Sequence, residues 1–230
     1  MNVQGFQKLT LLDFPGKVAC TVFTGGCNLR CPFCHNASLV NTPREMADRT
    51  QEVLSYLEKR KGILEGVCVT GGEPLLQPDL VPFLKRIKEM GYLVKLDTNG
   101  SDPDRLRAVL SEGCVDYVAM DVKSGPSAYS LAIGREMSAE PFLSSIRLLR
   151  ESGIPYEFRT TLVKGIHREE DVEEMAELLA GRERYFLQGF RDSGNLLGTG
   201  VEAFTREEMA HFLAIVKKKV PEARIRGQEE

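Results

Sequence analysis

The sequence predicts an α/β fold: a partial, open (β/α)6 barrel, TIM-barrel-like in plan and built on a parallel sheet. Short apolar, β-branched runs alternate about six times with amphipathic helical segments along the 230 residues. Parallel neighbours need a long crossover, and each helical segment can supply one. Eight strand–helix units would close a barrel, so about six predict an open one. A doubly wound sheet is the alternative.

The strands are predicted where β-branched and aromatic residues gather between turn residues. In chain order these runs are 18–24, 66–70, 92–98, 117–122, 154–163 and 184–190. Each run is short and apolar enough to lie in a sheet that helices cover.

The helices are predicted where apolar residues recur three or four positions apart, with charged residues opposite them. In chain order these segments are 48–60, 78–90, 102–112, 138–151, 169–180 and 206–219. Gly91, Gly113 and Gly153 follow the second, third and fourth segments and precede strands. We therefore expect these glycines to end the helices.

We expect a single domain over residues 1–230, with a core from about 10 to 191 and a C-terminal helix and strand over 204–230. A net charge of −3 and a pI near 5.8 do not favour binding to nucleic acid or anionic lipid. The sequence contains no apolar run of membrane-spanning length and no signal peptide pattern, so we expect a cytoplasmic protein without membrane contact. Cys20, Cys68 and Cys114 stand alone in or beside predicted strands, where we expect buried thiols.

Three further cysteines crowd into the loop that follows the first predicted strand. Cys27, Cys31 and Cys34 form a C-x3-C-x2-C array in a long loop, residues 25–47, which we call the cysteine loop. This loop leaves the carboxyl end of a parallel strand, where α/β folds bind ligands. Three thiolates can hold three irons of a [4Fe–4S] cluster and leave the fourth iron open for chemistry.

Other readings of the cysteine loop are a thioredoxin-like dithiol at Cys31 and Cys34, a c-type haem attachment site, and a zinc site completed by His35. The first two leave Cys27 unexplained, and haem attachment also requires export. Adjacent Cys34 and His35 rarely point at one zinc ion. The cluster is therefore the favoured hypothesis.

With Phe33 in its aromatic slot, this C-x3-C-x-aromatic-C array resembles the signature of the radical S-adenosylmethionine (SAM) superfamily. The resemblance implies SAM as the second cofactor, with its methionine amine and carboxylate on the open iron. One electron from the cluster then splits the sulfonium and releases a 5′-deoxyadenosyl radical. Phe33 and His35 would lie beside this cofactor.

The second predicted strand ends in Gly71, Gly72 and Glu73. Glycines before a proline can be an ordinary turn. The acidic residue favours a site, because Glu73 can neutralise an ammonium while the Gly72 backbone pairs with the methionine part of the cofactor. This segment is similar to the second motif of the same superfamily.

Charged residues also end the third and fourth predicted strands. Asp121 and Lys123 are two positions apart, so both face one side, and a structural ion pair is the simplest explanation. The segments resemble those of glycyl-radical-enzyme activases. By that resemblance Lys123 meets the cofactor carboxylate, while Asp97, Thr98, the Ala119 carbonyl and Asp121 hold a monovalent cation.

The last two strands offer weaker candidates. Arg159 points into the barrel or pairs with Glu157. Gln188 and Arg191, at the end of the sixth strand, lie where related activases contact the ribose or adenine. Two further histidines, His167 and His211, lie in charged surroundings, and we expect both to face solvent.

Residues 12–17 (Leu-Asp-Phe-Pro-Gly-Lys) and the Cys-His-Asn sequence after the array resemble the activating proteins of anaerobic ribonucleotide reductases. The resemblance implies a glycyl-radical enzyme as partner. Cys20, Cys68 and Cys114 are too scattered for a second cluster, so a flavodoxin or ferredoxin would supply electrons. The alternatives are a radical SAM enzyme acting on a small molecule, as a 7-carboxy-7-deazaguanine synthase does, and a zinc or dithiol module without radical chemistry.

Overall fold

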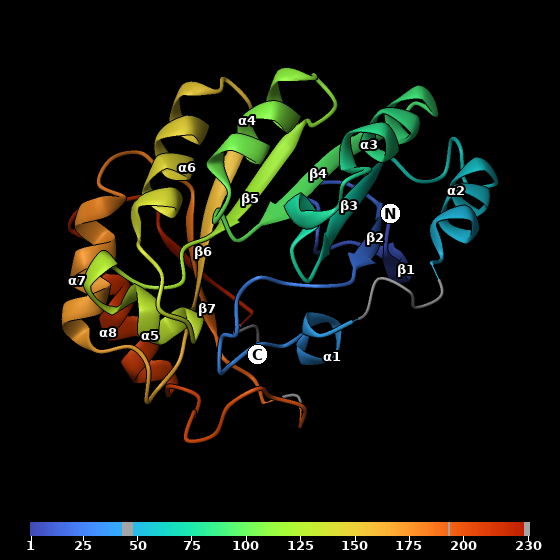
Figure 1. Cartoon of the computed structure of the whole chain (residues 1–230). Coiled ribbons are helices and arrows are strands. Elements are labelled where there is room, and N and C mark those ends of the chain that lie inside the picture. The colour runs from blue at the N-terminus through green and yellow to red at the C-terminus, as the bar shows by residue number, and fades with distance from the viewer. Residues whose placement is uncertain (43–47, 193, 228–230) are drawn as a thin grey trace.

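The computed structural model describes residues 1–42, 48–192 and 194–227 as one curved sheet of eight strands with helices outside it (Figure 1). The strands lie side by side in chain order, β1 to β8. A doubly wound sheet would reverse its strand order, so the sequential order confirms the barrel-like plan. The sheet is open rather than closed, with β1 and β8 at its two edges. Residues 43–47, the end of the predicted cysteine loop, lie outside the described ranges, as do 228–230 of the predicted tail.

Six strands match the predicted runs and pair in parallel. They are β2 (Ala19–Thr24), β3 (Gly66–Gly71), β4 (Leu93–Thr98), β5 (Tyr117–Asp121), β6 (Tyr156–Leu162) and β7 (Tyr185–Gly189). The strand expected in the tail is β8 (Arg224–Arg226), parallel to β7. The prediction missed β1 (Val3–Thr10), which pairs antiparallel with β2.

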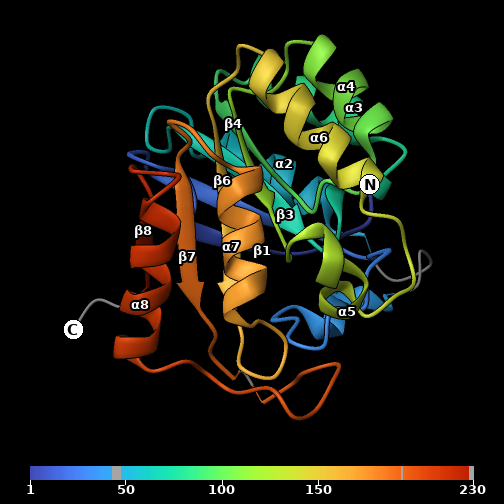
Figure 2. The same ribbon diagram turned by 90° about the vertical axis from the view of Figure 1, so that its left-hand side faces the viewer.

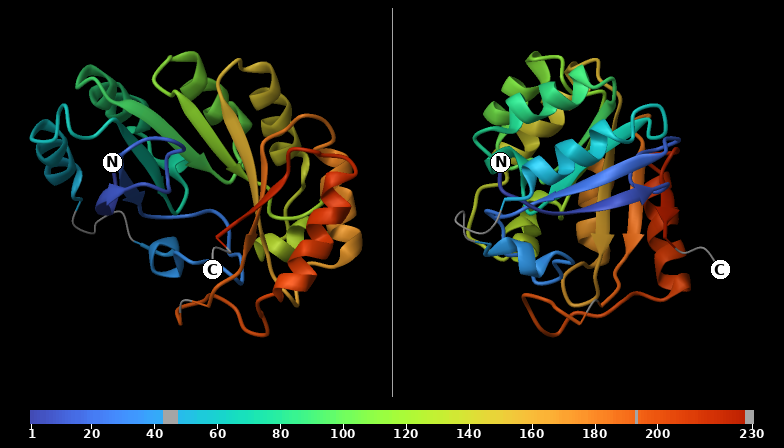
Figure 3. Two further views of the ribbon diagram at one scale, coloured as in Figure 1. Left: turned by 180° about the vertical axis from the view of Figure 1, so that it is seen from behind. Right: turned by 90° about the vertical axis from the view of Figure 1, so that its right-hand side faces the viewer.

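The helices cover the convex face of the sheet and leave its concave face to the interior of the barrel (Figure 3). The longer ones are α2 (Thr50–Glu58), α3 (Leu80–Glu89), α4 (Pro103–Ser111), α6 (Glu140–Glu151), α7 (Glu169–Leu178) and α8 (Arg206–Lys217). All six lie within or close to the predicted segments. Figure 2 shows α7 and α8 beside β6 and β7. In the described part of the chain, no helix is long and apolar enough to cross a membrane.

Short helices fill the connections after the strands. They are α1 (Ala37–Val40), α5 (Tyr129–Ile133), and the 3-10 turns η1 (Pro74–Leu76) and η2 (Pro126–Ala128). Gly91, Gly113 and Gly153 have φ values of 91°, 62° and 70°, which confirms their predicted role as helix ends.

The core between the sheet and its helices is apolar, and Cys20 and Cys114 belong to it, whereas the Cys68 thiol lies on the other face of the sheet, 3.8 Å from the Lys95 ammonium. Cys20, Cys68 and Cys114 are buried, as predicted, and all six cysteines carry free thiols. The concave face is different, because it buries charges. Lys95 on β4 is only 1% exposed. These charges lie along the wall of the site described next.

Candidate active site

A cavity of about 400 Å³ lies between the cysteine loop and the carboxyl ends of the parallel strands. Its volume is in the range of small-ligand sites. The predicted residues that line it are Cys27, Cys31, Phe33, Cys34, His35, Gly71, Gly72, Glu73, Asp97, Thr98, Asp121, Lys123, Arg159 and Gln188. The fold therefore brings together residues that are up to 161 positions apart, from Cys27 to Gln188.

Backbone hydrogen bonds within the cysteine loop hold it in place. The Gly26 N–H donates to the Leu39 carbonyl (2.7 Å), and the Cys34 N–H donates to the Cys31 carbonyl (3.1 Å). Cys31 is buried, and Cys27 and Cys34 are half-buried. Burial raises the pKa of the Cys31 thiol to about 12, and a bound metal would hold this group as a thiolate.

The two glycines at the end of β3 allow a close approach to the end of β2 and the start of the cysteine loop. Gly71 has a φ of 123°, and a Cβ there would lie 2.3 Å from the Thr24 nitrogen. A Cβ on Gly72 would lie 2.0 Å from the Gly26 carbonyl oxygen. Both neighbours are backbone atoms that cannot move aside. Close packing therefore requires glycine at both positions. The Gly72 N–H donates to the Thr24 carbonyl (2.8 Å), so this N–H already has a partner within the protein.

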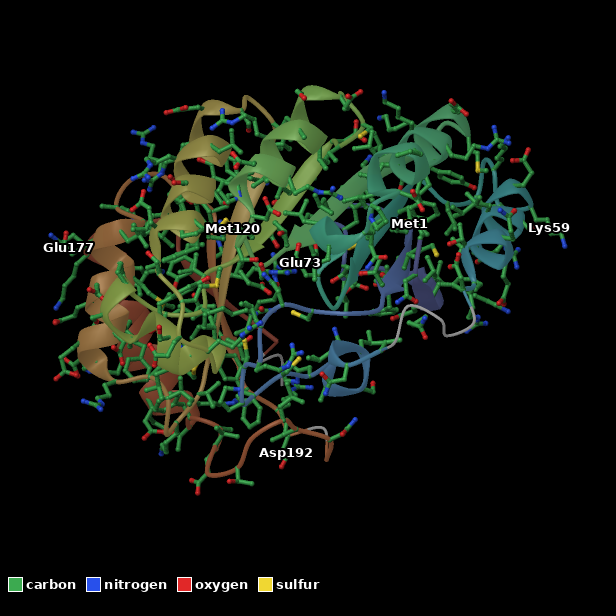
Figure 4. The ribbon with its side chains drawn as sticks, in the orientation of Figure 1. Met1, Lys59, Glu73, Met120, Glu177 and Asp192 are labelled. Atoms are coloured by element: carbon green, nitrogen blue, oxygen red, sulfur yellow. The ribbon has the colours of Figure 1, made fainter. Side chains whose placement is uncertain are left out.

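Glu73 is 1% exposed and lies above the cysteine loop in the middle of the molecule (Figure 4). Its carboxylate accepts hydrogen bonds from the Leu75 N–H (3.1 Å), the Thr98 hydroxyl (2.8 Å) and the Asn99 N–H (2.7 Å). Burial raises the pKa of Glu73 to about 7, although these three donors oppose the shift. A carboxylate has about four acceptor positions, so it can still receive a ligand ammonium.

An ionic network crosses the concave face of the sheet. Arg159 on β6 bridges two carboxylates, with Nη1 at 3.1 Å from Asp97 and Nη2 at 3.0 Å from Asp121. Lys123 pairs with the other oxygen of Asp121 (2.9 Å), and Lys95 with the other oxygen of Asp97. Burial alone would raise the pKa of Asp121, but Lys123 and Arg159 hold it at about 2. The sequence interpretation missed Lys95, although its two-residue spacing from Asp97 places both on one face.

The predicted cation would have to compete with this network. All four carboxylate oxygens of Asp97 and Asp121 face a lysine or arginine nitrogen, and the Thr98 hydroxyl donates to Glu73. Ala119 is fully buried on β5. A monovalent cation could bind here only if one of these side chains moved away, so its assignment stays a prediction.

The structure shows where Arg159 points on the fifth predicted strand. Arg159 faces into the barrel, whereas Glu157 pairs with Arg226 of β8 through contacts of 2.7 and 2.9 Å. Gln188 lines the cavity, as expected. Arg191 is exposed and donates to the Gly227 carbonyl (2.7 Å) outside the cavity. The expected contact of Arg191 with a cofactor is therefore not supported.

The expectation that both His167 and His211 face solvent is wrong for His167. His167 is 4% exposed, and its ring packs edge-on against Phe33 at 5.9 Å between centroids. His211 is exposed and pairs with Glu169 (2.9 Å), as expected. The error arose because His167 lies just before a charged helix but belongs to the turn that precedes it.

The β1–β2 hairpin contributes a wall of the cavity that the sequence interpretation did not assign. Gln7, Asp13, Thr21 and Phe23 line it. The Asp13 carboxylate accepts a hydrogen bond from the Thr21 hydroxyl. Asp13 lies within the segment 12–17 that carried the family resemblance, and this was the only signal for the wall in the sequence.

Comparison with known families agrees with this geometry. Residues 21–179, more than half of the chain, match the model of the Radical SAM superfamily. This chain belongs to that superfamily. It is therefore a radical SAM enzyme, and membership implies a [4Fe–4S] cluster and SAM as its cofactors.

Relatives of this radical SAM enzyme include proteins named as activases of glycyl-radical enzymes and as 7-carboxy-7-deazaguanine synthases. A Methanocaldococcus jannaschii protein named as a glycyl-radical enzyme activating enzyme is 32% identical over 195 residues, 82% of this chain and 79% of the relative. A Methanopyrus kandleri 7-carboxy-7-deazaguanine synthase is 32% identical over 196 residues, 73% of this chain and 74% of the relative. A Clostridium pasteurianum pyruvate formate-lyase-activating enzyme is 32% identical over 130 residues, 53% of this chain and 52% of the relative.

Solved structures agree on the fold. Streptococcus suis SuiB, bound to its precursor peptide SuiA, aligns with a TM-score of 0.70 at 14% identity, over 90% of this chain and 48% of SuiB. At this identity the likeness concerns the fold alone, and it supports the partial barrel of the radical SAM enzyme.

The donors around the cavity fit the implied cofactors. Three cysteine thiols line one wall, and no three His, Cys, Asp or Glu side chains of the described residues converge on the position of a single ion. A cubane takes each thiolate on a different iron, so its ligands need not converge. Glu73 and Lys123 supply opposite charges in the same cavity, which suits the charged ends of an amino acid.

Proposed function

We propose that this radical SAM enzyme activates a glycyl-radical enzyme by removing a hydrogen atom from one of its backbone glycines. The observation that carries the proposal is the 32% identity, over 82% of the chain, to a protein named for that activity. The sheet is open between β1 and β8, and in this proposal the glycine-bearing segment of the partner enters there. We further propose an anaerobic ribonucleotide reductase as the partner, from the resemblance of residues 12–17.

In this proposal Cys27, Cys31 and Cys34 ligate three irons of the cluster. When bound, the reduced cluster and SAM supply a 5′-deoxyadenosyl radical that takes a hydrogen from the glycine Cα, leaving 5′-deoxyadenosine, methionine and a glycyl radical. The cysteine loop holds these thiolates at the cavity wall and leaves one iron without a protein ligand.

Two buried charges orient the methionine part of SAM. We assign the Lys123 ammonium to its carboxylate and the Glu73 carboxylate to the N–H groups of its amine. Lys123 is held by Asp121, and Glu73 by three donors, so neither side chain must be ordered when the ligand binds. Arg159 fixes Asp121 in turn. The charged side chains of the site are therefore in position before SAM binds.

The electron comes from a separate flavodoxin or ferredoxin in this proposal. The cysteines outside the cysteine loop, Cys20, Cys68 and Cys114, are buried at positions far apart in the chain. They belong to strands β2 and β3 and to the turn before β5, so they do not build a second cluster.

A second candidate function is a radical reaction on a small molecule. The 7-carboxy-7-deazaguanine synthase relative favours it, with 32% identity over 73% of this chain. A cavity of about 400 Å³ also suits a small substrate.

One experiment separates these functions. The protein is reconstituted with iron and sulfide without oxygen, reduced, and incubated with SAM and an anaerobic ribonucleotide reductase. We expect 5′-deoxyadenosine together with a glycyl doublet in the electron paramagnetic resonance (EPR) spectrum of the reductase. Cys31→Ala should abolish both products, whereas Cys20→Ala, a buried thiol outside the loop, should retain them. A parallel incubation replaces the reductase with the substrate of a 7-carboxy-7-deazaguanine synthase. Formation of 7-carboxy-7-deazaguanine there, with no glycyl signal in the first incubation, would refute the activase proposal.

A further inference from the structure

His167 is a buried histidine for which the proposed chemistry has no use. It lies after β6, in the turn that leads to α7, and is 4% exposed. A buried imidazole without partners would be costly, so its contacts indicate why it is there. It touches three segments that border the cavity: the ends of β5 and β6, and the cysteine loop.

The turn and the ring form a closed pair of hydrogen bonds with Val163. The His167 N–H donates to the Val163 carbonyl (2.9 Å), and the Val163 N–H donates to ring atom Nδ1 (3.0 Å). Because Nδ1 accepts a hydrogen bond, the neutral ring must carry its own hydrogen on Nε2. The orientation and the tautomer of His167 are therefore both fixed by Val163.

The fixed Nε2–H points at one acceptor. It lies 2.7 Å from the backbone carbonyl of Lys123, at the end of β5. The side chain of Lys123 reaches the cavity and pairs with Asp121. The ring of His167 also contacts the ring of Phe33, which lies between Cys31 and Cys34 in the sequence. One imidazole thus ties the backbone at Lys123 to the middle of the cysteine loop.

We propose that His167 is a positioning residue for SAM: its Nε2–H holds the Lys123 backbone so that the ammonium meets the cofactor carboxylate beside the cysteine loop. This inference rests on the role of Lys123 in the proposed function. It assigns no chemistry to the imidazole. The ring acts through Lys123 and Phe33 and stays neutral throughout.

Two substitutions separate this role from a purely structural one. His167→Gln has the length to donate to the Lys123 carbonyl but gives up the ring acceptor of Val163. His167→Asn can accept from Val163 but is too short to reach Lys123. If His167 only stabilises the turn, SAM affinity should follow thermal stability in both variants. If it positions Lys123, SAM affinity should not follow thermal stability in the two variants.

The measurement is SAM binding to the reconstituted, reduced protein, followed by the change in the cluster EPR spectrum, with iron content and melting temperature alongside. We expect His167→Asn to bind SAM about tenfold more weakly at unchanged iron content, which is the effect of losing about one hydrogen bond. His167→Gln should bind within about threefold of the unsubstituted protein. His211→Asn, at an exposed histidine, is the control and should change neither property.

Equal SAM affinity of His167→Asn and the unsubstituted protein would overturn the inference, and so would a His167→Gln variant as weak as His167→Asn. Lys123→Met distinguishes this failure from that of the proposed function. If Lys123→Met binds SAM normally, the assignment of Lys123 fails and the inference fails with it. If Lys123→Met binds weakly while His167→Asn does not, only the role of His167 is refuted.

Discussion

The Glu73 N–H donates a hydrogen bond of 2.8 Å to the carbonyl of Gly26, which joins the end of β3 directly to the start of the cysteine loop. The two residues are separated by helices α1 and α2 and by strand β3, yet Gly26 directly precedes the cysteine array and Glu73 belongs to the segment that resembles the second motif of the superfamily. The bond holds the two segments together in the folded chain. One supplies the thiols, and the other holds the backbone from which they extend.

Gly72→Ala should break this junction. Its Cβ would lie 2.0 Å from the Gly26 oxygen and 2.6 Å from the Gly26 carbonyl carbon, so the two segments must move apart. Overpacking of this kind costs about 1–3 kcal/mol, and here it also displaces Cys27. We expect a lower melting temperature and less iron bound per chain after reconstitution. Gly5→Ala, where a Cβ meets nothing within 4 Å, is the matched control. Normal iron binding by Gly72→Ala would contradict the prediction.

Arg159→Met should destabilise the protein strongly. Asp97 and Asp121 are mostly buried, with side chains 11% and 29% exposed, and each would lose the guanidinium between them. Removing one partner of a buried ion pair costs about 3–5 kcal/mol. Arg159→Lys should recover only part of the lost stability, because the single ammonium of lysine cannot bridge both carboxylates. Urea unfolding measures both changes.

The control for Arg159 is Arg147→Met. Arg147 and its partner Glu140 are 58% and 64% exposed, so the loss of their pair should change the free energy of unfolding by less than about 1 kcal/mol. Similar effects of the substitutions at Arg159 and Arg147 would show that the network on the concave face does not stabilise the fold.

The stability of the cluster-free protein should fall as pH rises through the titration range of Glu73. Burial raises the pKa of this carboxyl to about 7 from its usual 4.5, so the folded chain binds a proton that the unfolded chain releases. The contribution is complete below about pH 4.5 and is lost as the pH passes 7. Unfolding midpoints at pH 5, 6, 7 and 8 give the slope. Glu73→Gln should flatten this slope relative to the unsubstituted protein, and an unchanged slope would refute the assignment.

The sequence predicted the parts of this molecule that depend on local pattern. The six parallel strands and the cysteine loop follow from apolar runs and spacing, and Asp97 and Asp121 were predicted from their places at strand ends. β1 was missed because Gly5 and a run of polar residues interrupt its alternation, and its pairing depends on the turn before β2. Local pattern also cannot show burial that distant segments create.

His167 illustrates the second kind of failure. Its neighbours in sequence are charged, and they correctly predict the helix that begins at Glu169. Its burial comes from Phe33 and Lys123, which lie 134 and 44 positions away in the chain. The ionic network has the same character, because Arg159 meets its carboxylates only when β4, β5 and β6 lie side by side.

Tyr129→Phe should leave the stability of the cluster-free protein unchanged or raise it. The Tyr129 ring is stacked on Phe142 at 4.5 Å, but its buried hydroxyl has no hydrogen-bond partner among the described residues. Removing an unpaired buried hydroxyl removes its desolvation penalty of about 1–3 kcal/mol while the ring keeps its packing. Tyr185→Phe is the matched control, since the Tyr185 hydroxyl is buried at 2.7 Å from that of Thr160, and its loss should cost about 1 kcal/mol. Urea unfolding of both variants compares the two hydroxyls directly. If Tyr129→Phe loses as much stability as Tyr185→Phe, the Tyr129 hydroxyl has a bound partner, such as an ordered water, that stabilises the folded chain.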